Sequence, residues 1–437
     1  MPCPHASVEA PSPLSRRDFA KSALAIGGSS ALAACADRGG MPDVPRGVDD
    51  PDSLPERQFA WDQFLPRDQH GNIALPEHQL LLFFDYASGG VPTGGEREQV
   101  ETALRGLERA YLPGSGRGPH RPAGRMPPPT PGLLFTLGYA PGYFDRYEPD
   151  LPVPLPTTEE TLNAIGEPAD RADSHDVAMV LVSDYVEVLL TVEQALLGNL
   201  DSLNGVEMPA SFDGVLERTE RRTGFVEQGR PAEEFEAEEI PESSPAAMGF
   251  KSGLENGKAS EDRVTIREGP FAEGTTQHVS RLVLSLDSWY DNSDEERLHQ
   301  MFSPHHSADA VGPVARRLAS HNGITPEIAA RAEEDAAEYD RVGHVQKAAR
   351  GRDEDFEPTI LRRSEAASTD LAKPAFNFTS VQRRIDRFVD VRRAMNESYD
   401  VPAENHGIRN YIEATERGNY LVPPRSLRAL PPARPDR

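Results

Sequence analysis

The residue best placed for a covalent modification is Cys35, at the end of the segment Leu32-Ala33-Ala34-Cys35. Small residues before a cysteine suit a signal peptidase, and the freed cysteine can then carry a lipid on its thiol. Upstream, Arg16 and Arg17 are followed by a Phe and a Lys at the spacing of a twin-arginine export signal. A short apolar stretch follows, too short and too small-sided for a stable membrane span. We therefore predict a signal peptide over residues 1–34.

This signal implies export by the twin-arginine translocase and attachment to the extracytoplasmic face of the membrane, at the cell surface, through a lipid on Cys35. Two alternatives stay open: cleavage without lipidation, and a cytosolic protein with a chance Arg pair. The rest of the sequence has no second apolar run of spanning length, so the lipid would be the only membrane contact.

Composition excludes several classes of partner. The formal net charge is -25, the pI is about 4.9, and the chain has only five lysines. A strongly acidic surface argues against nucleic acid or an anionic membrane surface as direct partners. Of the two cysteines, Cys3 and Cys35, the first would be lost with the signal peptide, so the mature chain can form no internal disulfide and no CxxC metal site.

Apolar spacing predicts two similar series of elements. Val100, Leu104 and Leu107, for example, share one helix face. We predict strands at 79–86, 132–139, 176–183, 223–226, 279–286 and 376–380, and helices at 96–111, 184–200, 294–302, 326–339 and 381–397. The first series has the order of a ferredoxin-like unit, and the second has a similar order. The predicted fold class is α+β, with two ferredoxin-like domains packed together.

The domain boundaries follow from composition. Residues 35–74 are rich in Pro, Asp, Arg and Gly and predict a disordered tether. The two ferredoxin-like domains are expected at 75–245 and 246–425, with a disordered tail at 426–437. Within them, a Gly/Pro/Arg-rich loop at 113–131 could shape an access channel, and an acidic run at 232–242 predicts a solvated linker.

Several segments, taken in order, resemble the dye-decolorising (Dyp-type) haem peroxidase family. The segment that begins Gly249-Phe250 is similar to that family's Gly-Phe-x-Asp-Gly-x-x-Asn signature, and His344 and Arg362, 18 residues apart, resemble its haem-ligand His and distal Arg. The matching segments are 134–145, 176–182, 249–256, 274–289, 343–347 and 360–364. The resemblance covers roughly residues 75–400 and implies the dimeric α+β barrel of that family.

The resemblance also implies a cofactor and a chemistry. It predicts one haem b per chain in the second domain, with His344 as iron ligand, since a neutral imidazole is a good axial donor. Arg362 would stabilise negative charge on peroxide as its O–O bond breaks. Arg363 would hold a haem propionate or face solvent. The implied partners are peroxide and an unknown reducing substrate, and an oligomer is possible.

The same resemblance shows departures at the site. The family's signature Asp, thought to carry the peroxide proton, falls on Ser252, and a hydroxyl has no useful pKa near neutrality. An Asn beyond the distal Arg is Ser364, and the acid that would orient the proximal His falls on Arg384 in a loose alignment. Loss of that acid would weaken the ligand's basicity and raise the iron's potential. Glu255 and His278 are candidate substitute bases.

Three functions therefore stay open. The first is a haem peroxidase that uses Arg362 without the Asp, with Ser252 at most orienting a water. The second is a haem-binding carrier or sensor without significant turnover. The third is a ferredoxin-like scaffold that has lost haem, in which His344 is a surface His in a loop and Arg362 a surface Arg paired with an acid.

The charge pattern predicts adaptation to strong salt, where screening removes self-repulsion between acidic side chains. We expect the free energy of unfolding, measured with denaturant, to rise steeply between dilute buffer and molar KCl. Full stability in dilute buffer would contradict the prediction.

Overall fold

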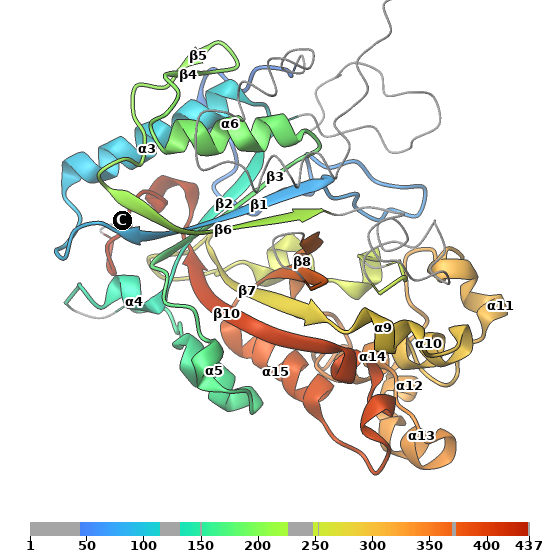
Figure 1. The fold of residues 1–437 in the computed structure, drawn as a ribbon. Helices are drawn as coiled ribbons and strands as arrows, with labels where there is room; N and C mark the ends of the chain where they lie inside the picture. The colour runs from blue at the N-terminus through green and yellow to red at the C-terminus, as the bar shows by residue number, and fades with distance from the viewer. Residues whose placement is uncertain are drawn as a thin grey trace, which may run out of the picture.

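The computed structural model describes residues 44–113, 132–148, 151–225, 248–251, 253–368 and 373–435. Its centre is a closed eight-stranded barrel with the strand order β1-β3-β2-β10-β7-β9-β8-β6 (Figure 1). The strands are β1 (His78–Tyr86), β2 (Leu134–Tyr139), β3 (Val177–Ser183), β6 (Leu216–Phe225), β7 (Thr275–Leu284), β8 (Leu361–Ser368), β9 (Ala375–Gln382) and β10 (Ile412–Val422), with a small hairpin of β4 (Ser202–Leu203) and β5 (Val206–Glu207) outside the barrel.

Strands β1 and β3 are almost continuously apolar because both of their faces are buried. One face packs beneath helices α3 and α6, and the other faces the barrel interior (Figure 1). The helices are α3 (Gly94–Ala110), α4 (Pro141–Phe144), α5 (Thr158–Ile165), α6 (Val186–Leu196), α8 (Glu261–Val264), α9 (Leu286–Tyr290), α10 (Asp294–Met301), α11 (Ala308–Val311), α12 (Pro326–Ala330), α13 (Ala332–Tyr339), α14 (His344–Ala349) and α15 (Ile385–Asn396).

The prediction of two ferredoxin-like units in an α+β fold is confirmed. Strands β1, β2, β3 and β6 come from the first unit, and β7, β8, β9 and β10 from the second. The two sets join at β2–β10, where Tyr139 pairs with Leu421, and at β6–β8, where Phe225 pairs with Ala367. The units therefore share one barrel and one continuous ring of strands.

Two barrel strands, β8 and β10, and the short hairpin strands β4 and β5 were missed, and two consecutive helices were predicted as one. β10 carries Glu413, Glu416 and Arg417, which hid its apolar half in the sequence, and β8 was not separated from the loop before it. The helix predicted at 326–339 is two helices, α12 and α13, which meet at Arg331. A helix break of this kind leaves the apolar periodicity nearly unchanged.

The predicted tether is wrong from residue 44 onward. Phe59 and Trp61 are at most 2% exposed and pack into the barrel's own clusters, and the Gln58 side chain bonds the backbone of Leu137 at 2.9 Å. The tail predicted at 426–437 is also wrong over 426–435. There, Arg428 is fully buried and its guanidinium binds Glu101 and Glu108 of α3. Buried aromatic side chains and ion pairs hold both segments against the barrel. Such contacts leave no apolar periodicity in the sequence, so the segments were predicted to be disordered.

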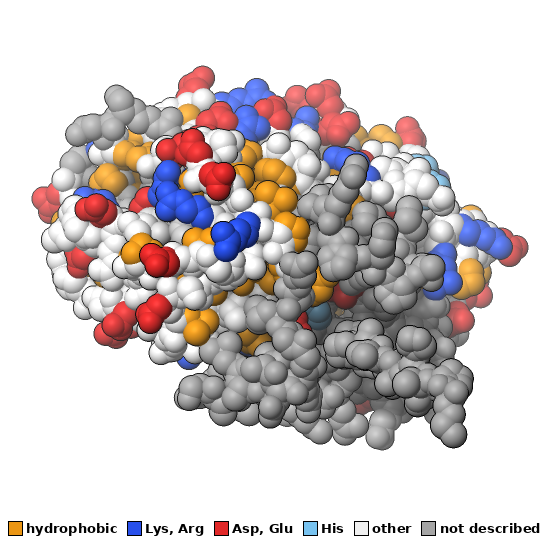
Figure 2. Space-filling view, turned by 90° about the horizontal axis from the view of Figure 1, so that it is seen from above, with side chains coloured by type: hydrophobic (Ala, Val, Ile, Leu, Met, Phe, Trp, Pro, Cys, Tyr) orange, Lys and Arg blue, Asp and Glu red, His pale blue; other side chains and the backbone are white. Residues whose placement is uncertain are grey.

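Several predictions fall outside the described residues: the signal peptide with Arg16 and Arg17, the lipid site Cys35, nearly all of the loop at 113–131, and the acidic run at 232–242. Within the described part of the chain, none of the helices combines the length and apolar character needed to cross a bilayer. The face above α3 and α6 shows Asp and Glu side chains with Arg and Lys among them (Figure 2).

Candidate functional site

One large cavity lies in the second unit, between β7–β9 and helices α14 and α15. Its volume is about 250 Å³, far above the roughly 30 Å³ that one water takes up. Its walls are mainly apolar, and its charged lining residues are all basic. These are Lys251, Arg352, Arg362, Arg392, Arg409 and Arg417, and no acidic residue of the described chain joins them. In a chain of net charge -25, this cavity is therefore suited to an anionic, largely apolar occupant.

His344 is the one histidine among the described residues that line the cavity, and it is the first residue of α14. Two glycines let the start of this helix pack closely. A Cβ on Gly343 would overlap the backbone of Phe302, and one on Gly407, whose φ is +73°, would lie 2.8 Å from the amide nitrogen of His344. Neither position accepts a side chain, so the Gly-His sequence is a packing requirement as well as a motif.

A buried carboxylate fixes the same helix. Asp335 on α13 is fully buried and accepts a hydrogen bond of 2.6 Å from the Gln346 side chain. Gln346 also reaches back to the Gly343 amide at 3.3 Å, which closes the first turn. These contacts fix the first turn of α14, which carries His344. Sequence analysis missed Asp335, since it stands in an otherwise solvated acidic helix.

The imidazole of His344 is held in its neutral form. Burial, together with the positive charges of Arg362, Arg392 and Lys347, lowers its pKa to about 3. Neither ring nitrogen hydrogen-bonds a side chain or backbone group of the described residues. A neutral imidazole with an available lone pair is the form that binds a metal ion.

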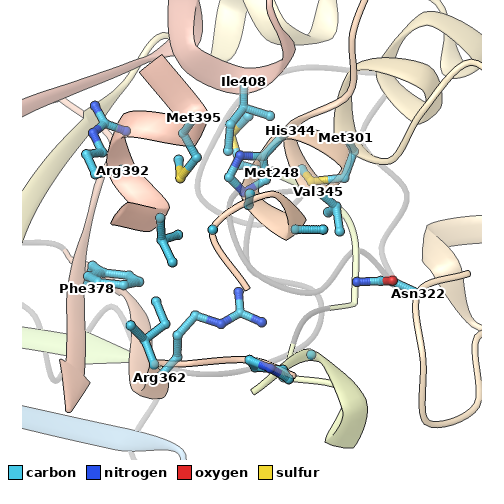
Figure 3. A pocket seen from close by; sticks show the side chains of 18 of the residues that line it. Met248, Met301, Asn322, His344, Val345, Arg362, Phe378, Arg392, Met395 and Ile408 are labelled. Carbon is cyan, nitrogen blue, oxygen red and sulfur yellow. The ribbon is translucent and has the colours of Figure 1, made fainter. Parts of the chain in front are cut away.

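Arg362 enters the cavity from β8, on the side opposite His344 (Figure 3). Gly257 faces its guanidinium, since a Cβ there would lie 3.9 Å from Nη2 of Arg362. Arg362 and His344 line the same cavity, and the charge of Arg362 helps to lower the His344 pKa. The structure therefore brings together the two residues that carry the central prediction.

The Gly249-Phe250 segment forms part of the wall. Gly249 has a φ of +79°, which turns the chain so that Phe250 lines the cavity and packs edge-on against Phe302 at 5.6 Å. The Trp289 indole donates a hydrogen bond of 3.1 Å to the Met248 carbonyl and holds the segment in place. Ser252 lies outside the described residues, although its neighbours Lys251 and Gly253 line the cavity.

A family model described as a family of unknown function, DUF7405, matches residues 76–424. The chain belongs to this family. No curated protein matches it.

Solved structures similar to this DUF7405 chain share its fold. Two are variants of DypB from Rhodococcus jostii RHA1 in complex with heme; each is 14% identical with a TM-score of 0.51, and they cover 86% and 82% of this chain and 99% and 96% of their own. A third is a dye-decolorizing protein from V. cholerae, 13% identical with a TM-score of 0.50, covering 84% of this chain and 98% of its own. At such low identity the likeness shows the fold alone: the DUF7405 chain has a divergent Dyp-like fold.

Arg363 does not hold a group in the cavity, so that prediction is corrected. Its guanidinium points away from the lining and binds the Asp62 carboxylate and the Phe59 carbonyl, both at 2.6 Å, and also Glu261. Successive residues of a strand point to opposite faces, and Arg362 took the cavity side. Arg363 instead fastens the segment that precedes β1 to the barrel.

Neither candidate substitute base lines the cavity. Glu255 forms ion pairs of 3.5 Å with Arg67 and Lys258 outside it. His278 is fully buried within β7, hydrogen-bonded to Asn419 at 2.8 Å and stacked behind the cavity residue Phe388 at 3.7 Å. Proximity in the sequence misled the prediction, because a neighbour in a strand need not share its face.

Arg384 does not take the place of an acid beside His344 either. It is the N-cap residue of α15, and its exposed side chain pairs with Asp386 at 2.8 Å. The residues of α15 that line the cavity are Phe388, Val391, Arg392 and Met395. The last helix thus presents apolar groups and one arginine to the cavity.

Sequence analysis also missed a buried ion cluster behind the cavity, which holds two of its lining arginines. Glu167, from the connection after α5, binds Arg392 at 2.8 Å and Arg417 at 2.7 Å, and these contacts offset its burial and lower its pKa to about 2. The three residues lie far apart in the sequence, so no local pattern reports the cluster. It draws the first unit into the construction of the second unit's cavity.

These residues fit a haem. The described chain groups no three His, Cys, Asp or Glu side chains that could hold a metal ion, so a metal at His344 needs its other ligands from a bound ring. A porphyrin supplies four such nitrogens, its apolar faces match the walls, and its carboxylates match the basic lining. His344 would hold the iron, and the cavity arginines would lie near its carboxylates or its open face.

The buried histidine His278 predicts a pH dependence of stability. Burial, followed by the charge of Arg417, lowers its pKa from 6.5 to about 3 in the folded state. The contribution of the neutral His278 to the free energy of unfolding is complete above pH 6.5 and is lost as the pH falls toward 3. Over this range, each proton that the unfolded chain takes up lowers the free energy of unfolding by about 1.4 kcal/mol per pH unit. Denaturant unfolding from pH 7 to 4 should show a shallower decline for His278→Gln than for the exposed control His70→Gln. Equal slopes would contradict a neutral buried His278.

Proposed function

We propose that this chain is an exported haem-dependent peroxidase of the dye-decolorising type, with an altered distal site. The observation that supports it is the arrangement of His344 and Arg362 on opposite sides of one apolar, basic cavity. The neighbouring DypB structures are complexes with heme, and their fold is the one seen in this chain. One haem b per chain would be bound here, and iron would supply the redox chemistry.

The residues of this chain would divide the work. His344 holds the group through a neutral imidazole, positioned by Gly343, Gly407 and the Asp335–Gln346 contact. Arg362 offers a fixed positive charge to the negative charge that develops on peroxide. The apolar wall residues exclude water. No described acid lines the cavity to move the peroxide proton, and such proton transfer typically contributes about 10²–10⁴-fold, so turnover should be slow.

A second function, a haem-binding carrier or sensor, is supported by that same missing acid. Binding needs His344, the apolar wall and the basic residues, all of which are present, whereas turnover also needs a proton carrier. The two functions differ in their response to peroxide.

The test uses residues 36–437, reconstituted with haem and purified in high salt. His344→Ala should remove most of the Soret absorbance, because it deletes the iron ligand, whereas His70→Ala should not. Arg362→Leu should keep the haem but lower the rate of the peroxide-induced Soret shift about 10²-fold or more.

The outcomes separate the functions. A Soret band that ignores peroxide in the unmodified chain would favour the carrier or sensor. Haem content unchanged by His344→Ala would refute the ligand assignment, and equal loss of haem and reactivity in Arg362→Leu would give Arg362 a structural role.

We further propose export by the twin-arginine translocase and a lipid on Cys35, supported by the sequence around Arg16, Arg17 and Cys35. A folded protein that acquires its cofactor before export suits this route. Arg16→Lys with Arg17→Lys should retain the uncleaved precursor inside the cell. Cys35→Ser should release the protein from membranes, as judged by fractionation and intact mass. Normal export of the double variant would contradict the route.

A further inference from the structure

Among the described residues around His344, none provides the acidic partner that usually supports a metal-bound histidine. The imidazole makes no hydrogen bond to any described residue, and the cavity face of α15 offers only Phe388, Val391, Arg392 and Met395. The two carboxylates of α15 are turned away from the cavity. Asp386 pairs with Arg384 at 2.8 Å, and Asp390 with Arg387 at 3.7 Å.

Positive charges take up this space instead. Lys347 lies three residues after His344 on α14, is 1% exposed, and hydrogen-bonds the Glu397 carbonyl. Burial lowers the Lys347 pKa to about 8, so it is still charged at neutral pH. Arg392 of α15 and Arg362 of β8 line the cavity, and Arg362 lies on the side opposite His344 (Figure 3). The positive charges of Arg362, Arg392 and Lys347 all act on His344 and help to lower its pKa. Glu167, the carboxylate that binds Arg392, also binds Arg417.

Both features act in one direction on a bound iron. A carboxylate hydrogen-bonded to the far ring nitrogen makes a histidine a stronger donor and stabilises oxidised iron, and no described residue supplies such a carboxylate to His344. Oxidised iron also carries one more positive charge than reduced iron, so nearby cations disfavour it. In a low-dielectric cavity these charge effects are larger than in water.

We propose that these residues poise a haem on His344 toward its reduced form, and that the cavity is thereby a binding site for a neutral diatomic gas as well as for peroxide. This rests on the haem site of the proposed function, but not on peroxidase turnover. One electron from an external reductant converts the iron, and the gas then binds without breaking a bond. Arg362, on the side opposite His344, provides the positive polarity that favours a polar bound gas.

The experiment uses residues 36–437 reconstituted with haem, as above, and carbon monoxide is the probe. Spectroelectrochemistry gives the midpoint potential, and the Soret band reports CO binding after mild reduction with ascorbate. We expect ascorbate to reduce the unmodified protein and CO to bind. Arg392→Gln should change the reduction equilibrium constant about tenfold toward the oxidised form. This makes the midpoint potential more negative by roughly 59 mV for one electron. Arg393→Gln, an exposed neighbour on α15, is the matched control and should leave it unchanged.

Arg392→Gln also removes a partner of Glu167 and could disturb the wall, so a second variant is needed. Lys347→Met keeps the length of a buried side chain and removes its charge together with its hydrogen bond to the Glu397 carbonyl, and it should shift the midpoint in the same direction. Arg392→Lys keeps the positive charge and should therefore have the midpoint potential of the unmodified protein.

The contrary outcomes are distinct. A protein that ascorbate does not reduce, or equal midpoints in Arg392→Gln, Lys347→Met and the control, would overturn this inference while leaving a peroxide-reactive haem intact. Absence of any Soret band would overturn the proposed function, and the inference with it.

Discussion

The cavity depends on one buried carboxylate. Glu167, which is mostly buried, follows α5 in the first unit and binds Arg392 of α15 and Arg417 of β10 in the second. Without it, two arginines would face each other in a low-dielectric wall, and removing one partner of such a buried cluster typically costs about 3–5 kcal/mol. The pairing is therefore structural in two senses: it joins the two halves of the barrel, and it lets positive charge line a cavity at tolerable cost.

The distribution of charge follows from this constraint. The chain is strongly acidic overall, yet the acids of the described residues stay out of the cavity, and six basic residues line it. An anionic ligand would thus meet an attractive potential inside this cavity. Arg428 with Glu101 and Glu108, and Arg363 with Asp62 and Glu261, show the complementary use of acids, as buried partners that fix the ends of the chain to the barrel.

The sequence predicted what is locally periodic or locally unusual. The apolar strands β1 and β3 and the helix α3 stand out by spacing, and His344 and Arg362 stand out by motif. β10 does not, because its buried charges find partners on distant strands, and neither does Arg363, whose side depends on the register of β8. Glu167 and Asp335 act only through contacts that the fold creates. Their roles could not be read before the barrel was known.

The site departs most from the pattern of the family that the sequence resembles in the groups that would transfer protons. Similarity at 14% identity shows a shared fold, but chemistry depends on the individual groups placed on that fold. Here a neutral histidine and a fixed arginine face each other, and the titratable groups that could shuttle a proton, Glu255 and His278, are bound elsewhere. Binding and charge stabilisation need only fixed groups, whereas turnover needs one that gains and loses a proton. The described cavity is therefore better equipped to hold a ligand than to process it quickly.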